Sequence, residues 1–112
     1  MKIGLKHFDR VCVLELQGQM VHPLGDRTLR EVIREQLEGG YEFFVVNMAA
    51  VPYIDSAGVG ELIASLKRVR ESGGDLAFAV VSQRVSDIFM LLGLVEILEV
   101  HGTEEEAIAS FV

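Results

Sequence analysis

The sequence predicts one α/β domain, residues 1–112, with a mixed and mostly parallel β-sheet and about four helices. Three observations favour this class. Apolar runs typical of strands alternate with stretches of helical periodicity, glycines follow the helical stretches, and the first two apolar runs are separated by only two residues. With 112 residues, half of them apolar, the chain is long enough to bury a core. The expected element order is β-β-α-β-α-β-α-β-α.

Two apolar runs near the N-terminus predict a β-hairpin. They cover residues 3–8 and 11–16, and only Asp9 and Arg10 separate them. Cys12, the single cysteine, lies between two valines in the second run. We therefore expect Cys12 to be a small buried side chain, because one thiol forms neither an internal disulfide nor a cysteine-based metal site.

Helical periodicity returns in three stretches along the middle of the chain. The first begins at Asp26, after a loop over residues 19–25, and Gly39-Gly40 ends it. The second covers residues 56–72 and the third residues 82–92. The apolar side chains expected to face inward are Leu29, Val32, Ile33 and Leu37; Val59, Leu62, Ile63, Leu66 and Val69; and Val85, Ile88, Phe89 and Leu92.

Two near-continuous apolar runs between these helices predict strands that are buried on both faces. They cover residues 41–48 and 76–81. A short last strand over residues 97–101 precedes a last helix over residues 104–111, which Thr103 begins with the spacing of a capping box. Right-handed crossovers make such strands parallel and place helices over the sheet.

Composition excludes several classes of function. Ten basic and seventeen acidic residues give a net charge of −7, which argues against a broad electrostatic contact with nucleic acid or an anionic membrane. The longest apolar region, residues 43–54, is too short to span a bilayer, and no N-terminal stretch fits a signal peptide. We expect a cytoplasmic protein that neither contacts nucleic acid directly nor inserts into a membrane.

The most informative segment is Tyr-Ile-Asp-Ser-Ala-Gly-Val-Gly, residues 53–60. It lies where a buried strand leads into a helix, which is where α/β sheets usually place their sites. Ser56 is expected to be the N-cap or a first-turn residue; as a cap, its change to alanine would cost about 1 kcal/mol. Gly58 and Gly60 each cost a helix about 1 kcal/mol relative to alanine. Two such glycines indicate a close approach to the backbone, either by a neighbouring strand or by a partner protein.

The patterns of common enzyme sites are missing from the sequence. A nucleophile elbow needs glycine two residues before the serine, where this chain has Ile54, and no Gly-Lys-Ser/Thr tripeptide is present. A response-regulator receiver domain binds magnesium through acidic residues after its first strand, and residues 17–20 of this chain contain no acidic residue. The histidines are isolated in the sequence: His7, His22 and His101. We predict no catalytic residue, no metal site and no cofactor.

Residues 54–60 resemble the Asp-Ser-Ser/Thr/Ala-Gly-Leu-Gly signature of STAS domains, and in particular that of bacterial anti-sigma factor antagonists. The resemblance extends to Gly18 after the second strand, to the Gly-Gly-Asp-Leu stretch at residues 73–76, and to the Gly-Leu turn at residues 93–94. It therefore covers essentially the whole chain.

The resemblance implies a non-enzymatic, partner-switching protein that regulates sigma-factor-dependent transcription. Unphosphorylated, it binds an anti-sigma factor and so releases the sigma factor. That partner is also a serine protein kinase, which phosphorylates the serine matching Ser56, and a serine phosphatase reverses the modification. The residues expected to contact the partner are Asp55, Ser56, Ala57, Gly58, Gly60, Met20 and His22.

Three positions depart from the family pattern. Residues 20–23 lack an acidic residue that the family often has there, Asn47 replaces a strand-end aspartate, and Leu92 stands in place of a small polar residue. The alternative is a non-switching STAS scaffold, or a subunit of a stress-signalling or transport complex, in which Ser56 only caps a helix. An enzyme using Ser56 or Asp55 ranks third, because no base or second catalytic motif accompanies them.

Overall fold

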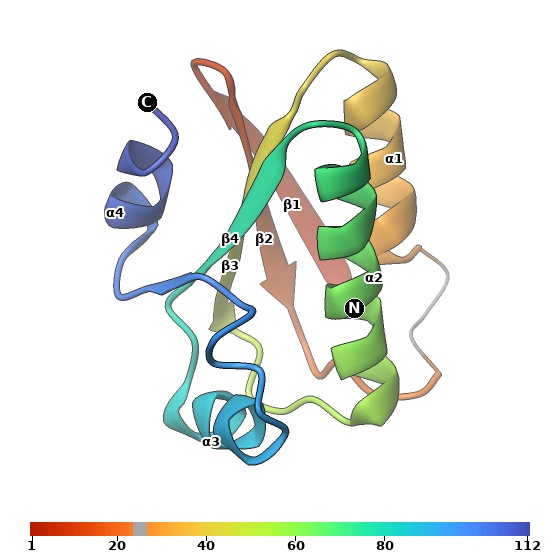
Figure 1. Cartoon of the computed structure of the whole chain (residues 1–112). Coiled ribbons are helices and arrows are strands. Elements are labelled where there is room, and N and C mark those ends of the chain that lie inside the picture. The colour runs from red at the N-terminus through yellow and green to blue at the C-terminus, as the bar shows by residue number, and fades with distance from the viewer. Residues whose placement is uncertain (24–26) are drawn as a thin grey trace.

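Five strands form one sheet in the order β1-β2-β3-β4-β5, with helices on both faces (Figure 1). The computed structural model describes residues 1–23 and 27–112. The strands are β1 (Lys2–Phe8), β2 (Val11–Gln17), β3 (Phe43–Ala50), β4 (Asp75–Ala79) and β5 (Val100–His101). The helices are α1 (Leu29–Glu38), α2 (Ser56–Glu71), α3 (Gln83–Leu91) and α4 (Glu104–Ala109). The predicted fold class and element order are confirmed.

The sheet is mixed, as predicted. β1 and β2 pair antiparallel through a two-residue turn, in which Asp9 has a φ of 57°, a left-handed conformation that aspartate tolerates better than most residues. β2, β3, β4 and β5 are all parallel. Their carboxyl ends therefore meet at one edge of the sheet, where α2 and α3 begin.

The core has one hydrophobic cluster on each face of the sheet. The larger cluster lies between the sheet and α1 and α2, and it also takes in Phe89 of α3. The smaller cluster lies under α4 and includes Val13 and Ala107. Because successive strand residues alternate in direction, Cys12 joins the larger cluster while Val13 joins the smaller one. Cys12 is fully buried, as predicted, and burial raises the pKa of its thiol to about 12.

Two side chains that the helical periodicity places inside are exposed. Ile63 of α2 is 38% exposed, because the buried stripe of that helix runs along the neighbouring positions that include Leu62 and Leu66. Leu92 is 53% exposed, because it is the C-cap residue of α3, where the helical period no longer fixes the direction of a side chain.

Several predicted boundaries also need correction. The last strand contains only two residues instead of residues 97–101, because Ile97 and Leu98 donate backbone hydrogen bonds to the carbonyl of Leu94 and close a turn there. The expected helix start at Asp26 lies outside the described residues. In the described part, α1 begins at Leu29, with Thr28 as its N-cap.

Candidate functional site

The chain after β2 and the chain before α2 run side by side at the carboxyl edge of the sheet. The N–H of Met20 donates to the carbonyl of Tyr53 at 3.0 Å, and the N–H of Asp55 donates to the carbonyl of Met20 at 3.1 Å. Met20 and Ile54 thereby form an isolated parallel bridge. This pairing fixes the first turn of α2 against the chain that follows β2.

The carboxylate of Asp55 links these two segments. Its Oδ1 accepts a hydrogen bond from the N–H of Gly58 at 3.0 Å, and its Oδ2 accepts one from the N–H of His22 at 2.9 Å. Asp55 is therefore the N-cap of α2, and Ser56 is the first helical residue. The backbone hydrogen bonds from His22 and then from Gly58 lower the pKa of Asp55.

Asp55→Asn should lower the stability of the chain at neutral pH but not in strong acid. The lowered pKa means that the stabilisation from the Asp55 carboxylate is present above the usual aspartate pKa of about 3.9 and is lost as the pH falls through the folded-state value. An asparagine keeps one of the two acceptor oxygens. We expect the Tm of the variant to lie below that of the wild type at pH 7 and the two to converge on acidification.

Thermal unfolding between pH 7 and roughly pH 2 measures this convergence. Asp9→Asn is the matched control, because Asp9 is exposed in the hairpin turn and asparagine also tolerates its positive φ. A Tm difference for Asp55→Asn that stays constant down to the lowest pH would contradict the role given to this carboxylate.

Ser56 differs from the other exposed serines of the chain. The hydroxyls of Ser72 and Ser110 donate to the carbonyls of Val69, at 2.7 Å, and Ala107, at 2.6 Å. Ser56 is exposed, and its hydroxyl has no hydrogen-bond partner within residues 1–23 and 27–112. Its Oγ is thus accessible and is not engaged in a cap.

The two glycines of the first turns have different surroundings. A Cβ on Gly58 would lie 2.2 Å from the carbonyl oxygen of Met20, whereas a Cβ on Gly60 would meet nothing within 4 Å. For Gly58, the close approach that the sequence indicated is therefore made by a neighbouring segment of the same chain. For Gly60, the open space above the backbone is available to a partner.

The predicted partner-contacting residues differ in exposure. Ser56, Gly60 and His22 are exposed, and Asp55 and Ala57 are half-buried. Met20 and Gly58 are buried, so their contribution to a contact would be to position the exposed backbone beside them. All seven lie on the chain after β2 or on the N-cap and first turns of α2, two regions more than thirty residues apart in the sequence.

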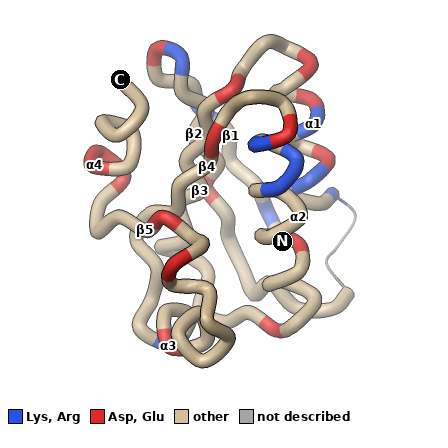
Figure 2. The backbone as a smooth tube through the Cα atoms, in the orientation of Figure 1, with Lys and Arg blue, Asp and Glu red and all other residues tan. Residues whose placement is uncertain are grey.

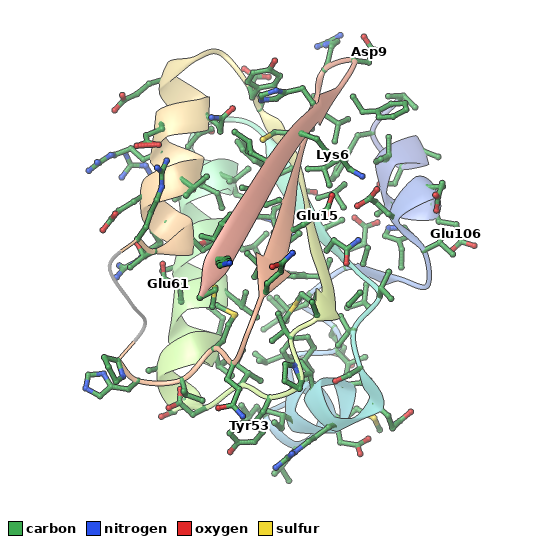
Figure 3. The ribbon with its side chains drawn as sticks, turned by 180° about the vertical axis from the view of Figure 1, so that it is seen from behind. Lys6, Asp9, Glu15, Tyr53, Glu61 and Glu106 are labelled. Atoms are coloured by element: carbon green, nitrogen blue, oxygen red, sulfur yellow. The ribbon has the colours of Figure 1, made fainter. Side chains whose placement is uncertain are left out.

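Sequence reasoning missed one contact at this end of the molecule. The guanidinium of Arg84, in the first turn of α3, lies over the ring of Tyr53 at 4.5 Å from its centroid. Figure 3 shows Tyr53 at the same end of the molecule as α3. No pattern in the sequence pairs these residues, because they belong to different elements. The contact connects the start of α3 to the segment that leads into Ser56.

Asn47 does not point toward this site. Its amide donates to Glu104 of α4 at 2.9 Å, and its Oδ1 accepts from the N–H of Ala49. The side chain therefore faces the α4 side of the sheet, whereas α2 covers the opposite face. The asparagine that replaces the family's strand-end aspartate therefore contributes to holding α4 against the sheet and does not contribute to the Ser56 site.

The described residues offer neither a metal site nor a membrane span. No group of three or more histidine, cysteine, aspartate or glutamate side chains in residues 1–23 and 27–112 could hold a metal ion. In the same part of the chain, no helix has the length and apolar character needed to cross a bilayer.

Comparison with known proteins identifies the family. A family model described as the STAS domain matches residues 2–107. The anti-sigma-B factor antagonist of Staphylococcus aureus is 33% identical over 79 residues, which are 70% of this chain and 73% of that protein. The chain belongs to the STAS family of anti-sigma factor antagonists. This confirms the family that the sequence motifs indicated.

Solved structures share the fold of this STAS domain. One is the Bacillus cell fate determinant SpoIIAA in its phosphorylated form. Its structure matches this one with a TM-score of 0.75 and 23% sequence identity, and the match covers 99% of this chain and 100% of SpoIIAA. A sulfate transporter family protein from Wolinella succinogenes has a TM-score of 0.74 and 21% identity, covering 91% of this chain and 84% of that one. Both likenesses concern the fold alone.

Proposed function

We propose that this STAS domain binds an anti-sigma factor of the serine-kinase type while Ser56 carries a free hydroxyl, and that phosphorylation of Ser56 ends the binding. The proposal depends above all on the exposed Ser56 hydroxyl, which has no partner among the described residues. It is supported by the antagonist relative in Staphylococcus aureus and by the existence of a phosphorylated form of Bacillus SpoIIAA.

The phosphoryl transfer needs a base from the kinase. The Ser56 Oγ forms a bond to the γ-phosphorus of ATP, the bond from that phosphorus to the bridging oxygen breaks, and ADP leaves with its electron pair. Asp55 is adjacent, but its two oxygens already accept hydrogen bonds from Gly58 and His22, and its lowered pKa makes it a weak base. We therefore expect the kinase to accept the hydroxyl proton.

A phosphate at Ser56 changes the surface without unfolding the helix. It adds a charge of about −1.5 to −2 at the first position of α2. The free N–H groups and the dipole of a helix N-terminus favour an anion, so the folded state tolerates the group. A partner that covers Ser56 would have to desolvate the phosphate next to the Asp55 carboxylate, which is costly without a matching cation. A serine phosphatase restores the binding state.

Ser56→Ala should abolish phosphorylation and leave the fold intact. Because Asp55 and not Ser56 caps α2, the loss of about 1 kcal/mol expected for a capping serine should not occur, and the Tm should match that of the wild type. The variant should remain in the binding state in the presence of ATP. Intact-mass measurement after incubation with ATP and each serine-kinase anti-sigma factor of the host tests this.

Ser72→Ala is the control at the other end of the same helix and should take up one phosphoryl group like the wild type. If Ser56→Ala is modified as fully as the wild type, the modified residue is another one and the proposal fails.

A second candidate is a non-switching STAS module within a larger complex. It is favoured by the fold shared with the Wolinella sulfate transporter family protein. In that case no serine kinase of the anti-sigma type would modify the chain, and the chain would co-elute stably with a larger assembly in size-exclusion chromatography of a native extract. Phosphorylation of Ser56 in this experiment would favour the switch over the non-switching module.

A further inference from the structure

Large apolar side chains are exposed along the end of α3 and the segment that follows it. We call this surface the α3–β5 patch. Its members are between 46% and 85% exposed: Met90, Leu91, Leu92, Val95, Ile97 and Val100. Six large apolar side chains are thus exposed within eleven positions. Exposed apolar surfaces of this kind often mark interaction sites in soluble proteins.

A small cavity lies at the edge of the patch, and Val95 and Val100 of the patch line it. It has a volume of about 180 Å³, and its lining residues come from the chain between β4 and α3, from α3, and from the segment that leads into and begins β5. The lining residues are Val81, Ser86, Phe89, Val95, Leu98 and Val100. Five of the six lining side chains are apolar, so an apolar side chain of a partner could anchor there, and such anchors dominate the energy of many protein interfaces.

The charge near the patch is mainly acidic, and Arg84 at the start of α3 is the only lysine or arginine in residues 71–112. Residues 85–112 contain six acidic residues and no lysine or arginine, and Asp87, Glu96 and Glu99 lie within or next to the patch. Six of the ten basic residues fall instead in residues 27–34 and 67–70, on and around α1 and α2. Figure 2 shows most of the blue on α1 and α2, where red is also present, whereas red alone is seen around β5 and on α4. The patch is thus an apolar surface with an acidic border.

We propose that the α3–β5 patch binds an amphipathic helix of a protein partner whose apolar stripe is bordered by lysine or arginine. The stripe would cover the exposed apolar side chains and place one of them in the cavity, while the basic border would meet Glu96 and Glu99. A helix fits better than an added strand, because β5 offers an edge of only two residues. This surface is additional to the one around Ser56.

Charge also separates this partner from two other occupants. A second copy of the chain docked through the same patch would bring the acidic borders together, which is repulsive. An anionic membrane would repel the same border. Both occupants are therefore disfavoured, and both are outcomes that the experiment below can detect.

Two synthetic helical peptides provide the test. Both carry the same leucine stripe; one has lysines along its borders and the other has glutamates. Fluorescence anisotropy with the full chain should show that the lysine-bordered peptide binds at least about tenfold more tightly, and that its affinity falls as salt is added. The double variant Leu91→Ser/Val95→Ser should lose at least about tenfold of that affinity.

The control variant is Phe8→Ser/Val112→Ser, which removes two exposed apolar side chains that line a different cavity, between the β1–β2 turn and α4, and should bind like the wild type. Glu96→Gln should reduce the salt dependence of binding to the lysine-bordered peptide. Equal binding of the two peptides, no binding of the lysine-bordered peptide, or an unaffected Leu91→Ser/Val95→Ser variant would overturn the proposal. So would a dimer, or binding to phosphatidylserine vesicles, that this double variant abolishes.

Discussion

Ser56→Asp should weaken binding to the cognate anti-sigma factor by more than about tenfold and leave the Tm nearly unchanged. The carboxylate replaces an exposed hydroxyl at the first position of α2, where the helix dipole favours a negative charge. The folded chain therefore accepts the substitution. A partner that covers the site must desolvate this charge beside Asp55, and that cost appears only in the complex.

Isothermal titration calorimetry with the anti-sigma factor, with thermal unfolding of the free variant alongside, measures both effects. Ser72→Asp is the matched control, because it adds the same charge to an exposed serine at the other end of α2. It should bind like the wild type and be slightly less stable, since an anion is unfavourable at a helix C-terminus. Ser56→Asn adds similar bulk without charge and should fall between wild type and Ser56→Asp. Equal affinities for Ser56→Asp and the wild type would refute the switch.

Gly58→Ala should destabilise the fold by roughly 1–3 kcal/mol, the usual cost of overpacking a tight site. Its Cβ would lie 2.2 Å from the carbonyl oxygen of Met20 and 2.6 Å from the side chain of Ile54. A backbone oxygen cannot move aside without displacing its segment, so the chain after β2 must shift away from α2. The hydrogen bond between Asp55 and the N–H of His22 would then be strained as well.

Gly60→Ala, two positions along the same helix, should behave in the opposite way. Nothing lies within 4 Å of its added Cβ, so the helix should gain up to about 1 kcal/mol. If a partner approaches the backbone at Gly60, binding of the anti-sigma factor should nevertheless weaken. Chemical denaturation of Gly58→Ala and Gly60→Ala measures their stability, and calorimetry with the anti-sigma factor measures their binding. A stable Gly58→Ala variant, or a Gly60→Ala variant that is both more stable and fully binding, would contradict the roles given to the two glycines.

Local patterns determined which elements form. Alternating and continuous apolar runs predicted the strands, and the helical periods and their glycine stops predicted the helices, because these features depend on neighbours within a few residues. The same reasoning went wrong where the regular period ends. Leu92, which the pattern placed inside, follows the last turn of α3, and Ile97, which it placed in the last strand, closes a turn instead. Both side chains are exposed in the α3–β5 patch.

The candidate site likewise has features that the sequence shows and features that only the tertiary structure shows. Ser56 and the two glycines could be recognised from the sequence because their order within residues 53–60 is itself the motif. The tertiary structure decided what each residue does, since the partners come from elsewhere in the chain. His22 gives Asp55 a second hydrogen bond, the carbonyl of Met20 excludes a side chain at Gly58, and the capping role falls to Asp55. The contacts of His22 and Met20 join segments more than thirty residues apart, and only the packing of α2 against the chain after β2 brings them together. The cap is local, but the sequence alone did not show that Asp55 rather than Ser56 provides it.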